Sequence, residues 1–533
     1  MQSEFIPVPI YVDGRPLTLS EINAVAASAR PVAIPSEALT RVLRSRRVIE
    51  EILATDQTVY GVNTGFGKLA DVRIPAGKLA LLQTNLVRSH ACGLGEPLSE
   101  SESRAVLLLR ANVLAKGYSG VRPALLELLV AMLNAGVHPI IPARGSVGAS
   151  GDLAPLAHLA LVVIGEGEAM HLGRRMPGAE ALAAAGLRPI QLAAKEGLAL
   201  LNGTQAMTAV GALAIHHAIQ LAASSDLAGA MSLEALMGTP AAFDTRIHQA
   251  RPHGGQIASA EHLLSLLEGS EIRESHRHQK DDPRVQDAYC LRCMPQVHGA
   301  VRDVLRHVAS ILETESGSAT DNPLVFPSDP FVPATKAATS ASAASSANPA
   351  SSAVSVLSGG NFHGAPLAYA FDYAAIALTD LASIAERRID RLINPDINEG
   401  LPAFLCADAG LSSGYMIAHV TAAALLNECK VLAHPSSTDS VPTSGGKEDH
   451  VSMGMTGALK LRQITHNLEL ILAIEMMCAA QGLDYRAPLK PSPAVSRAHA
   501  TIRGVVPHLD EDRIPAPDIQ AIANLLREGK VTA

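Results

Sequence analysis

The apolar positions of this 533-residue chain recur mainly with the spacing of an α-helix. Residues 99–102 read Ser-Glu-Ser-Glu, a capping-box pattern that opens an apolar stretch with helical spacing. Residues 123–133 repeat that spacing. Longer stretches rich in alanine and leucine, with few strand-like alternations, follow at residues 206–237, 366–393, 411–432 and 457–480. Each is longer than an average globular helix, so each predicts a core helix.

These stretches predict a mainly α fold. We expect an elongated bundle of long helices in residues 201–533 and a smaller mixed N-terminal region in residues 1–200 that carries the active-site loops. Helices this apolar commonly pack against partner subunits as well, which predicts a homo-oligomer. Residues 334–352 are rich in alanine, serine and threonine and lack bulky apolar anchors, so we expect a mobile or loosely helical segment there.

Composition limits the classes of function. The chain has 43 Lys and Arg against 51 Asp and Glu, a net charge of -8 that offers no basic field for nucleic acid and no polybasic membrane patch. The N-terminal segment carries Glu4 where a signal peptide has basic residues, and we expect no apolar run near the roughly 18 residues of a membrane span. Six cysteines fit a reducing compartment. The sequence predicts a cytoplasmic enzyme that acts on small molecules.

A zinc site is the first candidate for chemistry. Cys290 and Cys293 form a C-x-x-C pair, and His276 and His278 lie upstream. A structural zinc site usually brings a second pair at regular spacing, and this segment lacks one. We therefore expect no metal.

A second candidate is the segment at residues 145–152, which reads Gly-Ser-Val-Gly-Ala-Ser-Gly-Asp. Its glycine spacing fits neither the dinucleotide fingerprint nor a Walker loop. If the amide nitrogen of Gly151 attacks the carbonyl carbon of Ala149 and water leaves, and Ser150 then loses its hydroxyl as water, a methylidene-imidazolone ring forms. Such an electrophile withdraws electrons from a substrate amine or ring. A plain turn is the alternative interpretation.

Residues 149–158 closely resemble the signature of the aromatic amino acid ammonia-lyases, and residues 58–67 and 447–454 match further blocks of that family in the same order. The resemblance implies a carbon–nitrogen lyase that forms 4-methylidene-imidazol-5-one from its own Ala149, Ser150 and Gly151, with no external cofactor. It also implies a mainly α-helical homotetramer with active sites shared between subunits. By the same comparison, residues 334–352 resemble an insertion.

Removal of ammonia also requires a base for the weakly acidic β-proton of the substrate. Tyr60 is the candidate, because it begins a glycine-punctuated segment at residues 60–67 that can close over a site. A phenol titrates near pH 10, so its surroundings must tune it. A tyrosine that packs in a turn is the alternative, and the resemblance implies the catalytic role.

Recognition of the substrate carboxylate is expected from Arg292, whose guanidinium offers a bidentate fork. Its spacing from Gln286 and Tyr289 predicts that all three lie on one helix face. The resemblance implies that Arg292 holds the carboxylate and that Gln286, Tyr289, Asn202 and Phe362 line the electrophile and the active site. An asparagine before a glycine ordinarily signals only a turn, but the Asn202 carboxamide can instead donate a hydrogen bond to the imidazolone oxygen.

The substrate side chain is predicted from two polar residues. Ser89-His90 resembles the histidine-specific members of the family, and the Glu448 carboxylate can accept an imidazole N–H. We expect L-histidine as the substrate and trans-urocanate as the product.

Two departures keep other substrates open. Lys447 stands where relatives commonly have glutamine and can pair with Glu448, and Gly364-Ala365 stands where histidine-specific relatives usually carry Ala-Glu. Phenylalanine or tyrosine ammonia-lyase is the alternative activity, followed by a related aminomutase. A fumarase-like lyase and a noncatalytic helical scaffold fit the sequence less well.

Overall fold

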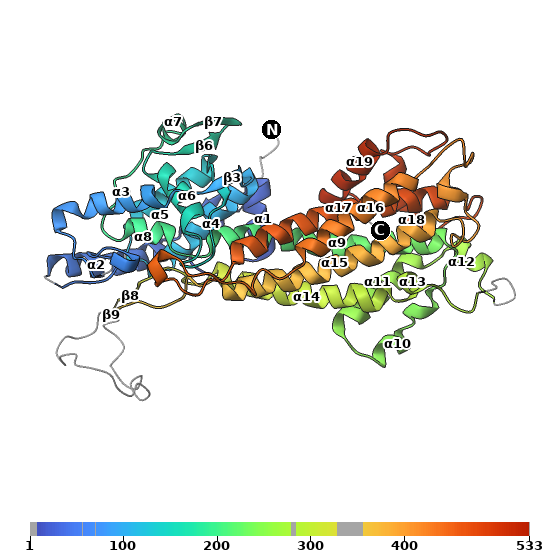
Figure 1. Ribbon diagram of the computed structural model, residues 1–533, viewed down its shortest axis with the longest axis horizontal. Helices are drawn as coiled ribbons and strands as arrows, with labels where there is room; N and C mark the ends of the chain where they lie inside the picture. Colours follow the sequence, from blue (N-terminus) through green and yellow to red (C-terminus); the bar gives the residue numbers. More distant parts are fainter. Residues whose placement is uncertain (1–7, 56, 70, 279–283, 328–354, 532–533) are drawn as a thin grey trace. The chain divides into compact units, whose positions relative to one another are not determined.

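The computed structural model describes residues 8–55, 57–69, 71–278, 284–327 and 355–531 (Figure 1). The chain divides into two compact units. The first consists of Met1–Val210, Leu312–Ala368 and Ser437–Thr456, and the second of Gly211–Ile311, Tyr369–Ser436 and Gly457–Ala533. The first unit thus extends beyond the expected residues 1–200 by two later segments, which carry Phe362 and Glu448. The segment at residues 334–352 lies outside the described residues.

The first unit is built mainly on short and medium helices. Those that precede residue 202 are α1 (Leu19–Ser28), α2 (Ser36–Ala54), α3 (Leu79–His90), α4 (Glu100–Ala115), α5 (Pro123–Asn134), α6 (Leu153–Val163), α7 (Gly178–Ala184) and α8 (Glu196–Leu201). The predicted capping box starts α4: the Ser99 hydroxyl accepts the Glu102 N–H at 3.2 Å, and the Glu102 carboxylate accepts the Ser99 N–H at 2.8 Å. The α4 helix is almost wholly buried and packs against α1 and α5.

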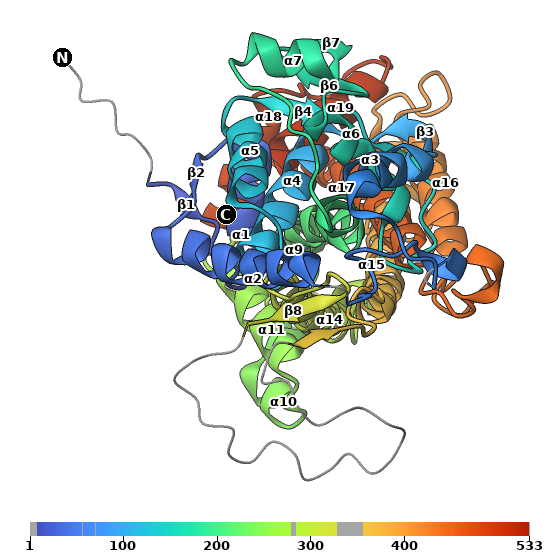
Figure 2. The ribbon, with the colours of Figure 1, turned by 90° about the vertical axis from the view of Figure 1, so that its left-hand side faces the viewer.

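Short strands connect these helices. They are β1 (Ile10–Tyr11), β2 (Val32–Ala33), β3 (Leu94–Pro97), β4 (Val137–Pro139), β5 (Pro142–Arg144), β6 (Glu168–His171), β7 (Arg174–Pro177), β8 (Leu324–Phe326) and β9 (Ser355–Leu357). β1 and β2 pair in parallel, whereas β3–β5, β4–β6–β7 and β8–β9 are antiparallel. The three-stranded sheet packs against α7 (Figure 2).

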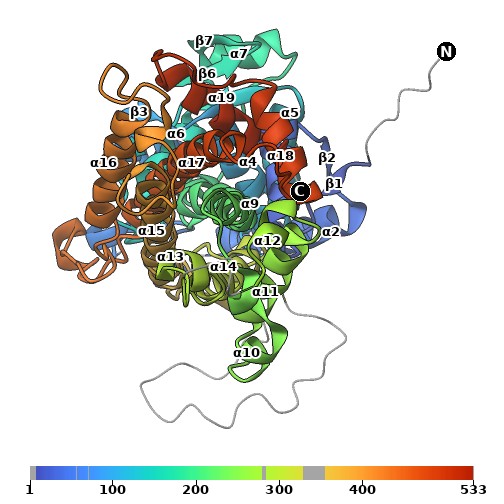
Figure 3. The same cartoon turned by 90° about the vertical axis from the view of Figure 1, so that its right-hand side faces the viewer.

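The second unit contains the long helices. Its elements are α9 (Gln205–Ala235), α10 (Thr245–Gln249), α11 (Gly254–Leu267), α12 (Glu271–Ser275), α13 (Tyr289–Arg292), α14 (Met294–Ser316), α15 (Ala365–Ile393), α16 (Met416–Leu432), α17 (Gly454–Asp484), α18 (Pro493–Arg503) and α19 (Ala516–Arg527). The first turns of α9, α15 and α17 and the last turn of α14 belong to the first unit. Within the second unit, α9 lies among α14, α15 and α17 (Figure 3).

Glycines permit this close packing of helices. A Cβ on Gly211 of α9 would lie 2.1 Å from the ring of Phe371 on α15. A Cβ on Gly229 would lie 2.3 Å from the sulfur of Met294 on α14. A larger residue at either position would force the facing Phe371 or Met294 side chain to move.

The structure confirms three of the four predicted long helices closely and shortens the fourth. The stretches at residues 206–237, 366–393 and 457–480 correspond to α9, α15 and α17. The stretch at residues 411–432 becomes helical only at Met416. Gly414 explains the late start, because its φ is +54° and a Cβ there would lie 2.3 Å from the carbonyl oxygen of Phe404. The chain before α16 is therefore held in a turn.

The expectation that no apolar run approaches a membrane span needs correction. By length and composition, α9 and α15 are both long and apolar enough to cross a membrane, and 67% of the apolar window of each is buried inside the protein. Buried charges also occur in this core. Arg388 of α15 pairs with Glu475 of α17 at 2.5 and 2.9 Å, and the hydroxyl of Ser232 on α9 donates to the same carboxylate at 2.8 Å. These are the features of core helices in a folded unit.

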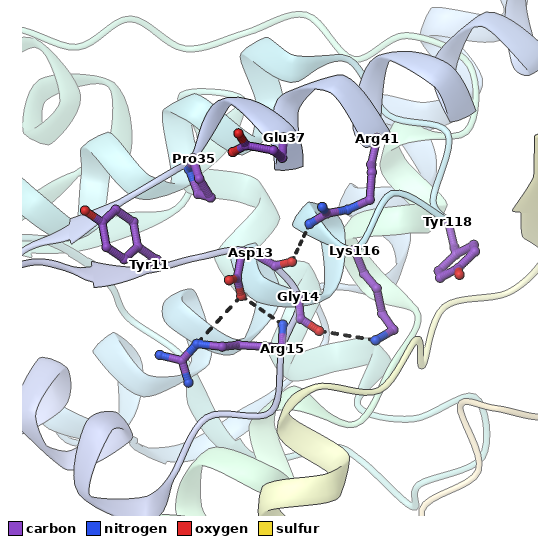
Figure 4. A pocket seen from close by; sticks show the side chains of 9 residues that line it. All are labelled: Tyr11, Asp13, Gly14, Arg15, Pro35, Glu37, Arg41, Lys116 and Tyr118. Atoms are coloured by element: carbon purple, nitrogen blue, oxygen red, sulfur yellow. Dashed lines mark hydrogen bonds and ion pairs between the residues drawn. The ribbon is translucent and has the colours of Figure 1, made fainter.

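One cavity of the first unit lies apart from the predicted site residues. It has a volume of about 660 Å³ and is bordered by β1, the start of α2 and the end of α4 (Figure 4). Its cations bind backbone carbonyls: Arg41 donates to Asp13 at 2.5 Å, and Lys116 donates to Gly14 at 3.2 Å and to Gly317 at 2.7 Å. These side chains hold the turn after β1 against the end of α4, which explains their presence without a ligand.

Candidate active site

The Ala149–Ser150–Gly151 segment lies between β5 and α6 and is pressed against the turn that follows α8. Gly151 has a φ of +75° and forms a parallel bridge with Gly203. The Asp152 N–H donates to the Gly203 carbonyl at 2.7 Å. A Cβ on Gly151 would lie 2.1 Å from that carbonyl oxygen. Only glycine fits this position, for reasons of both conformation and space.

The other side of the segment is equally close to the chain before α17. A Cβ on Gly148 would lie 2.1 Å from the hydroxyl oxygen of Ser452, which itself donates to the Gly148 carbonyl at 3.2 Å. The Met453 N–H donates to Val147 at 2.9 Å. The loop is therefore packed closely on two sides, at Gly148 and at Gly151. A backbone cyclisation between Ala149 and Gly151 needs small residues that can adopt a tight turn, and both glycines have a positive φ, so the residues present fit the expected group.

Asp152 anchors the end of this loop. Its buried carboxylate accepts the Ser146 hydroxyl and the Met207 N–H, both at 2.8 Å. Burial raises the pKa of Asp152 to about 6, although these hydrogen bonds favour the ionised form. The carboxylate thus ties the loop to the start of α9.

Two cavities open on the segment. The outer one has a volume of about 520 Å³ and the inner one about 340 Å³, and Tyr60, Gly67, Ser150, Asn202 and Glu448 line both. The outer cavity is completed by Asp71, Ala149, Asn322, Ser358, Gly359, Phe362, His363, Lys447, Asp449 and His450. The inner cavity is completed by Phe66, Leu69, Leu86, His90, Leu153, Leu198, Leu201 and Ser444. Most of the predicted site residues therefore meet in the first unit.

Tyr60 is held by close packing of the residue that follows it. Gly61 has a φ of +75°, and a Cβ there would lie 2.8 Å from both the Leu198 side chain and the Pro323 ring. Burial raises the pKa of the Tyr60 phenol above 10, the Glu448 carboxylate adds to the rise, and a backbone contact at Gly67 opposes it. The phenol is therefore protonated at neutral pH in the free chain.

Glu448 is bound by three hydroxyl groups. One oxygen, Oε1, accepts the Ser150 hydroxyl at 2.9 Å. The other, Oε2, accepts Thr443 at 2.9 Å and Ser444 at 2.7 Å. The pairing with Glu448 that Lys447 could form is not found among the described residues, where Lys447 lines the outer cavity and forms no ion pair.

His90 ends α3 and supplies the second polar group of the inner cavity. Its Nδ1 lies 3.0 Å from the Ser89 hydroxyl. Burial lowers the pKa of His90 from its usual value near 6.5, so the ring is neutral at pH 7. Leu86, Leu153 and Leu198 provide apolar walls nearby.

Asn202 contacts buried polar groups through both its side chain and its backbone. Its amide nitrogen donates to the Asn322 carbonyl at 3.0 Å, while its Oδ1 is buried and has no partner among the described residues. The fully buried Arg110 donates to the Asn202 carbonyl at 2.8 Å. The predicted bond to an imidazolone oxygen was not tested by these contacts and stays a prediction.

The buried ion pair between Lys195 and Asp321 should contribute to the stability of the fold. Lys195 and Asp321 lie 2.8 Å apart and both side chains are fully buried. We expect Asp321→Asn to lower the free energy of unfolding by about 3–5 kcal/mol, because it leaves a buried ammonium without its carboxylate. Thermal and urea unfolding measure the loss. The control is Glu166→Gln, which removes the exposed pair with Arg88 and should change stability far less. Equal effects would contradict the prediction.

The remaining predicted residues lie in the second unit. Tyr289 and Arg292 belong to α13, and the Arg292 guanidinium lies 4.5 Å from the centre of the Tyr289 ring. Gln286 precedes this four-residue helix, so the prediction of one helix face for all three is wrong. Asp287 gives the reason: its carboxylate accepts the Thr239 N–H at 2.7 Å and holds the chain out of the helix. None of the three lines the two cavities of the first unit.

Sequence reasoning missed several residues of the site. Thr443 and Ser444 were not singled out, although a Thr-Ser-Gly-Gly run before Glu448 is a turn signal that offers two hydroxyl donors. His363 and His450 stack with ring centres 5.8 Å apart in the outer cavity. At Gly364, where the sequence departs from histidine-specific relatives, a Cβ would lie 2.7 Å from the Met207 sulfur, so a larger residue would require the Met207 side chain to move.

Comparisons with known proteins agree over nearly the whole chain. A family model described as aromatic amino acid lyase matches residues 17–504. A histidine ammonia-lyase of Koribacter versatilis (strain Ellin345) is 55% identical and covers 98% of this chain and 99% of its own. The crystal structure of histidine ammonia-lyase from Trypanosoma cruzi has 42% identity and a TM-score of 0.87, covering 98% of this chain and 94% of that one. Tyrosine aminomutase from Streptomyces globisporus has 39% identity and a TM-score of 0.89, covering 98% of both chains.

Proposed function

Because the chain belongs to the aromatic amino acid lyase family and is a carbon–nitrogen lyase, we propose that it removes ammonia from L-histidine to give trans-urocanate. The observation that carries this proposal concerns two of the polar residues that line the inner cavity. The Glu448 carboxylate and the neutral His90 ring lie among leucine side chains. An imidazole ring matches these walls, since it offers an N–H to the carboxylate and apolar faces to the leucines.

Desolvation explains why this cavity favours histidine. A phenyl ring would remove water from Glu448 and His90 and offer neither of them a hydrogen bond. A site built around hydrogen bonds to its substrate discriminates strongly against an analogue that lacks those groups. The same argument disfavours phenylalanine as the natural substrate.

The electrophile in this proposal is 4-methylidene-imidazol-5-one made from Ala149, Ser150 and Gly151. Once formed, it supplies an electron sink for the substrate amine or ring. The close packing of the loop supports its formation, because Gly203 and Ser452 leave no room for a side chain at residues 151 and 148. Tyr60 borders both cavities and is the proposed base for the β-proton.

The proposed holder of the substrate carboxylate is Arg292, with Tyr289 as a further catalytic residue and Gln286 as a neighbour. We infer that these residues act in a homotetramer whose active sites are shared between copies of the chain. Exposed apolar stripes in the second unit support self-association. They are Tyr369, Tyr373 and Ile376 on α15, and Ile417, Val420 and Val431 on α16. Light scattering of the purified protein measures the assembly.

We further infer that the enzyme works in the cytoplasm. The six cysteines are all free thiols, which supports a reducing compartment.

Turnover of three amino acids tests the proposed substrate. Purified enzyme is incubated separately with histidine, phenylalanine and tyrosine, and ammonia and the unsaturated acid are followed. We expect kcat/KM to be highest for histidine and to exceed that for phenylalanine by about 10⁴-fold, because a phenyl ring offers no hydrogen bond to Glu448 or His90. Faster formation of cinnamate or coumarate would overturn the substrate, and accumulation of a β-amino acid would indicate an aminomutase.

A further inference from the structure

We propose that Thr443 and Ser444 are positioning residues that fix one oxygen of the Glu448 carboxylate and leave the other to receive the substrate ring. The inference rests on the proposed histidine substrate and on the proposed maturation of Ser150. It concerns two residues to which neither proposal gives a role.

A tight hairpin brings the two hydroxyls to the carboxylate. The Thr443 N–H donates to the Glu448 carbonyl at 2.8 Å, and the Gly446 N–H donates to the Thr443 carbonyl at 2.9 Å. Ser444 has a φ of +51°, a left-handed conformation that a residue with a Cβ rarely adopts. In this conformation its hydroxyl reaches Oε2 of Glu448 at 2.7 Å. The backbone strain is thus coupled to a contact that a glycine could not make.

The two oxygens of the carboxylate have separate partners. Oε2 accepts both hairpin hydroxyls, at 2.9 Å from Thr443 and 2.7 Å from Ser444. Oε1 accepts the Ser150 hydroxyl alone, at 2.9 Å. Two charge-assisted hydrogen bonds on Oε2 favour this orientation of the carboxylate, with Oε1 directed away from the hairpin hydroxyls.

Maturation of Ser150 removes the partner of Oε1. In that step the Cα–H and Cβ–O bonds of Ser150 break, a carbon–carbon double bond forms, and the hydroxyl leaves with the proton as water. Oε1 then faces the inner cavity without its donor. A carboxylate oxygen left unpaired beside leucine walls is costly, so an incoming N–H is favoured there. The formation of the electrophile therefore also exposes the acceptor that recognises the imidazole ring.

A purely structural role for the two hydroxyls predicts different behaviour. The hairpin is also held by its own backbone hydrogen bonds, so its fold does not depend on the hydroxyls. If they serve only the fold, their loss affects every ligand of the cavity alike. If they position Glu448, their loss affects only ligands that carry a ring N–H.

Equilibrium binding to the mature enzyme separates the two roles. The probes are trans-urocanate and cinnamate, which differ in the ring N–H, measured by calorimetry. We expect the double variant Thr443→Val, Ser444→Ala to bind urocanate about 10- to 100-fold more weakly, which corresponds to the loss of the hydrogen bond between the ring N–H and the charged Glu448 carboxylate. The variant should bind cinnamate as tightly as the parent does. Near-ultraviolet absorbance of the imidazolone and the melting temperature should match those of the parent.

Single variants keep the test informative if the double variant does not fold. Thr443→Ser retains the hydroxyl and should restore parental binding, whereas Thr443→Val should not. Ser444→Gly relieves the left-handed backbone and Ser444→Ala does not, yet both should weaken urocanate binding equally, because both lose the hydroxyl. Tighter binding by Ser444→Gly than by Ser444→Ala would contradict the role of the hydroxyl.

The outcomes distinguish failure of this inference from failure of the proposed activity on histidine. A parent enzyme that binds cinnamate as tightly as urocanate overturns the histidine substrate, and the inference falls with it. A parent that prefers urocanate, with a double variant that prefers it as strongly or loses both ligands equally, overturns the inference alone.

Discussion

A Ser150→Ala enzyme is expected to lose turnover by roughly 10⁴- to 10⁶-fold, the loss seen when a unit of covalent catalysis is removed. Alanine has no hydroxyl to lose, so the exocyclic double bond cannot form. The loop around it should keep its shape, because its contacts to Gly203 and Ser452 come from the backbone of neighbouring residues. The electrophile is therefore removed while the cavities remain.

Intact mass measures this result directly. The parent should be lighter than its translated sequence by two water molecules, and Ser150→Ala by one at most. Ser358→Ala is the control, because Ser358 also lines the outer cavity but is not part of the reacting segment. It should keep both the mass loss and the turnover. An active Ser150→Ala enzyme, or a parent of unmodified mass, would remove the basis of the proposed chemistry.

Tyr60→Phe is expected to lower kcat by about 10²- to 10⁴-fold, the contribution of a positioned general base. The electrophile should still form, since the hydrogen bonds of the 145–152 loop do not involve the phenol. Urocanate binding should change little. The loss then reports the proton-transfer step rather than the assembly of the site.

The pH dependence gives an independent check on Tyr60. Burial and Glu448 raise its pKa above 10, so the phenolate is the minor form at neutral pH. Its fraction grows about tenfold for each unit of pH below the pKa, and the parental rate should therefore rise with pH. Tyr60→Phe should lose this rise. The control is Tyr118→Phe, because Tyr118 lines the separate cavity shown in Figure 4. This variant should keep the parental dependence of rate on pH. The same pH profile in Tyr60→Phe would exclude Tyr60 as the base.

The helices of this protein were largely predictable because their signals are local. The capping box at Ser99 and Glu102 and the long alanine-rich stretches act over a few residues, and the structure contains the corresponding helices. The predictions of helix boundaries failed where a residue contacts another part of the chain. Gly414 meets the Phe404 carbonyl, and Asp287 binds the Thr239 N–H. No local sequence pattern contains these contacts. The predicted start of α16 and the predicted helix at Gln286 were therefore wrong.

The candidate site also has features that the sequence predicted and features that it did not. Motif blocks identified Tyr60, Ser150, Asn202 and Glu448 from the sequence, and the structure brings all four to the same pair of cavities. The sequence left open a pairing of Lys447 with Glu448, and in the structure hydroxyl groups bind the carboxylate instead. That outcome depends on the hairpin geometry, which a charge pattern does not contain.

The sequence by itself determined the candidate residues for chemistry, because residue type and spacing decide what a backbone segment or a side chain can do. It also determined most of the helices, whose hydrogen bonds close within a few residues. Only the tertiary structure decided that Gly203 and Ser452 compress the 145–152 loop and that Ser150 meets Glu448, 298 residues away. Such contacts depend on how three separate chain segments pack into the first unit, where the burial of apolar surface, rather than local preference, brings them together.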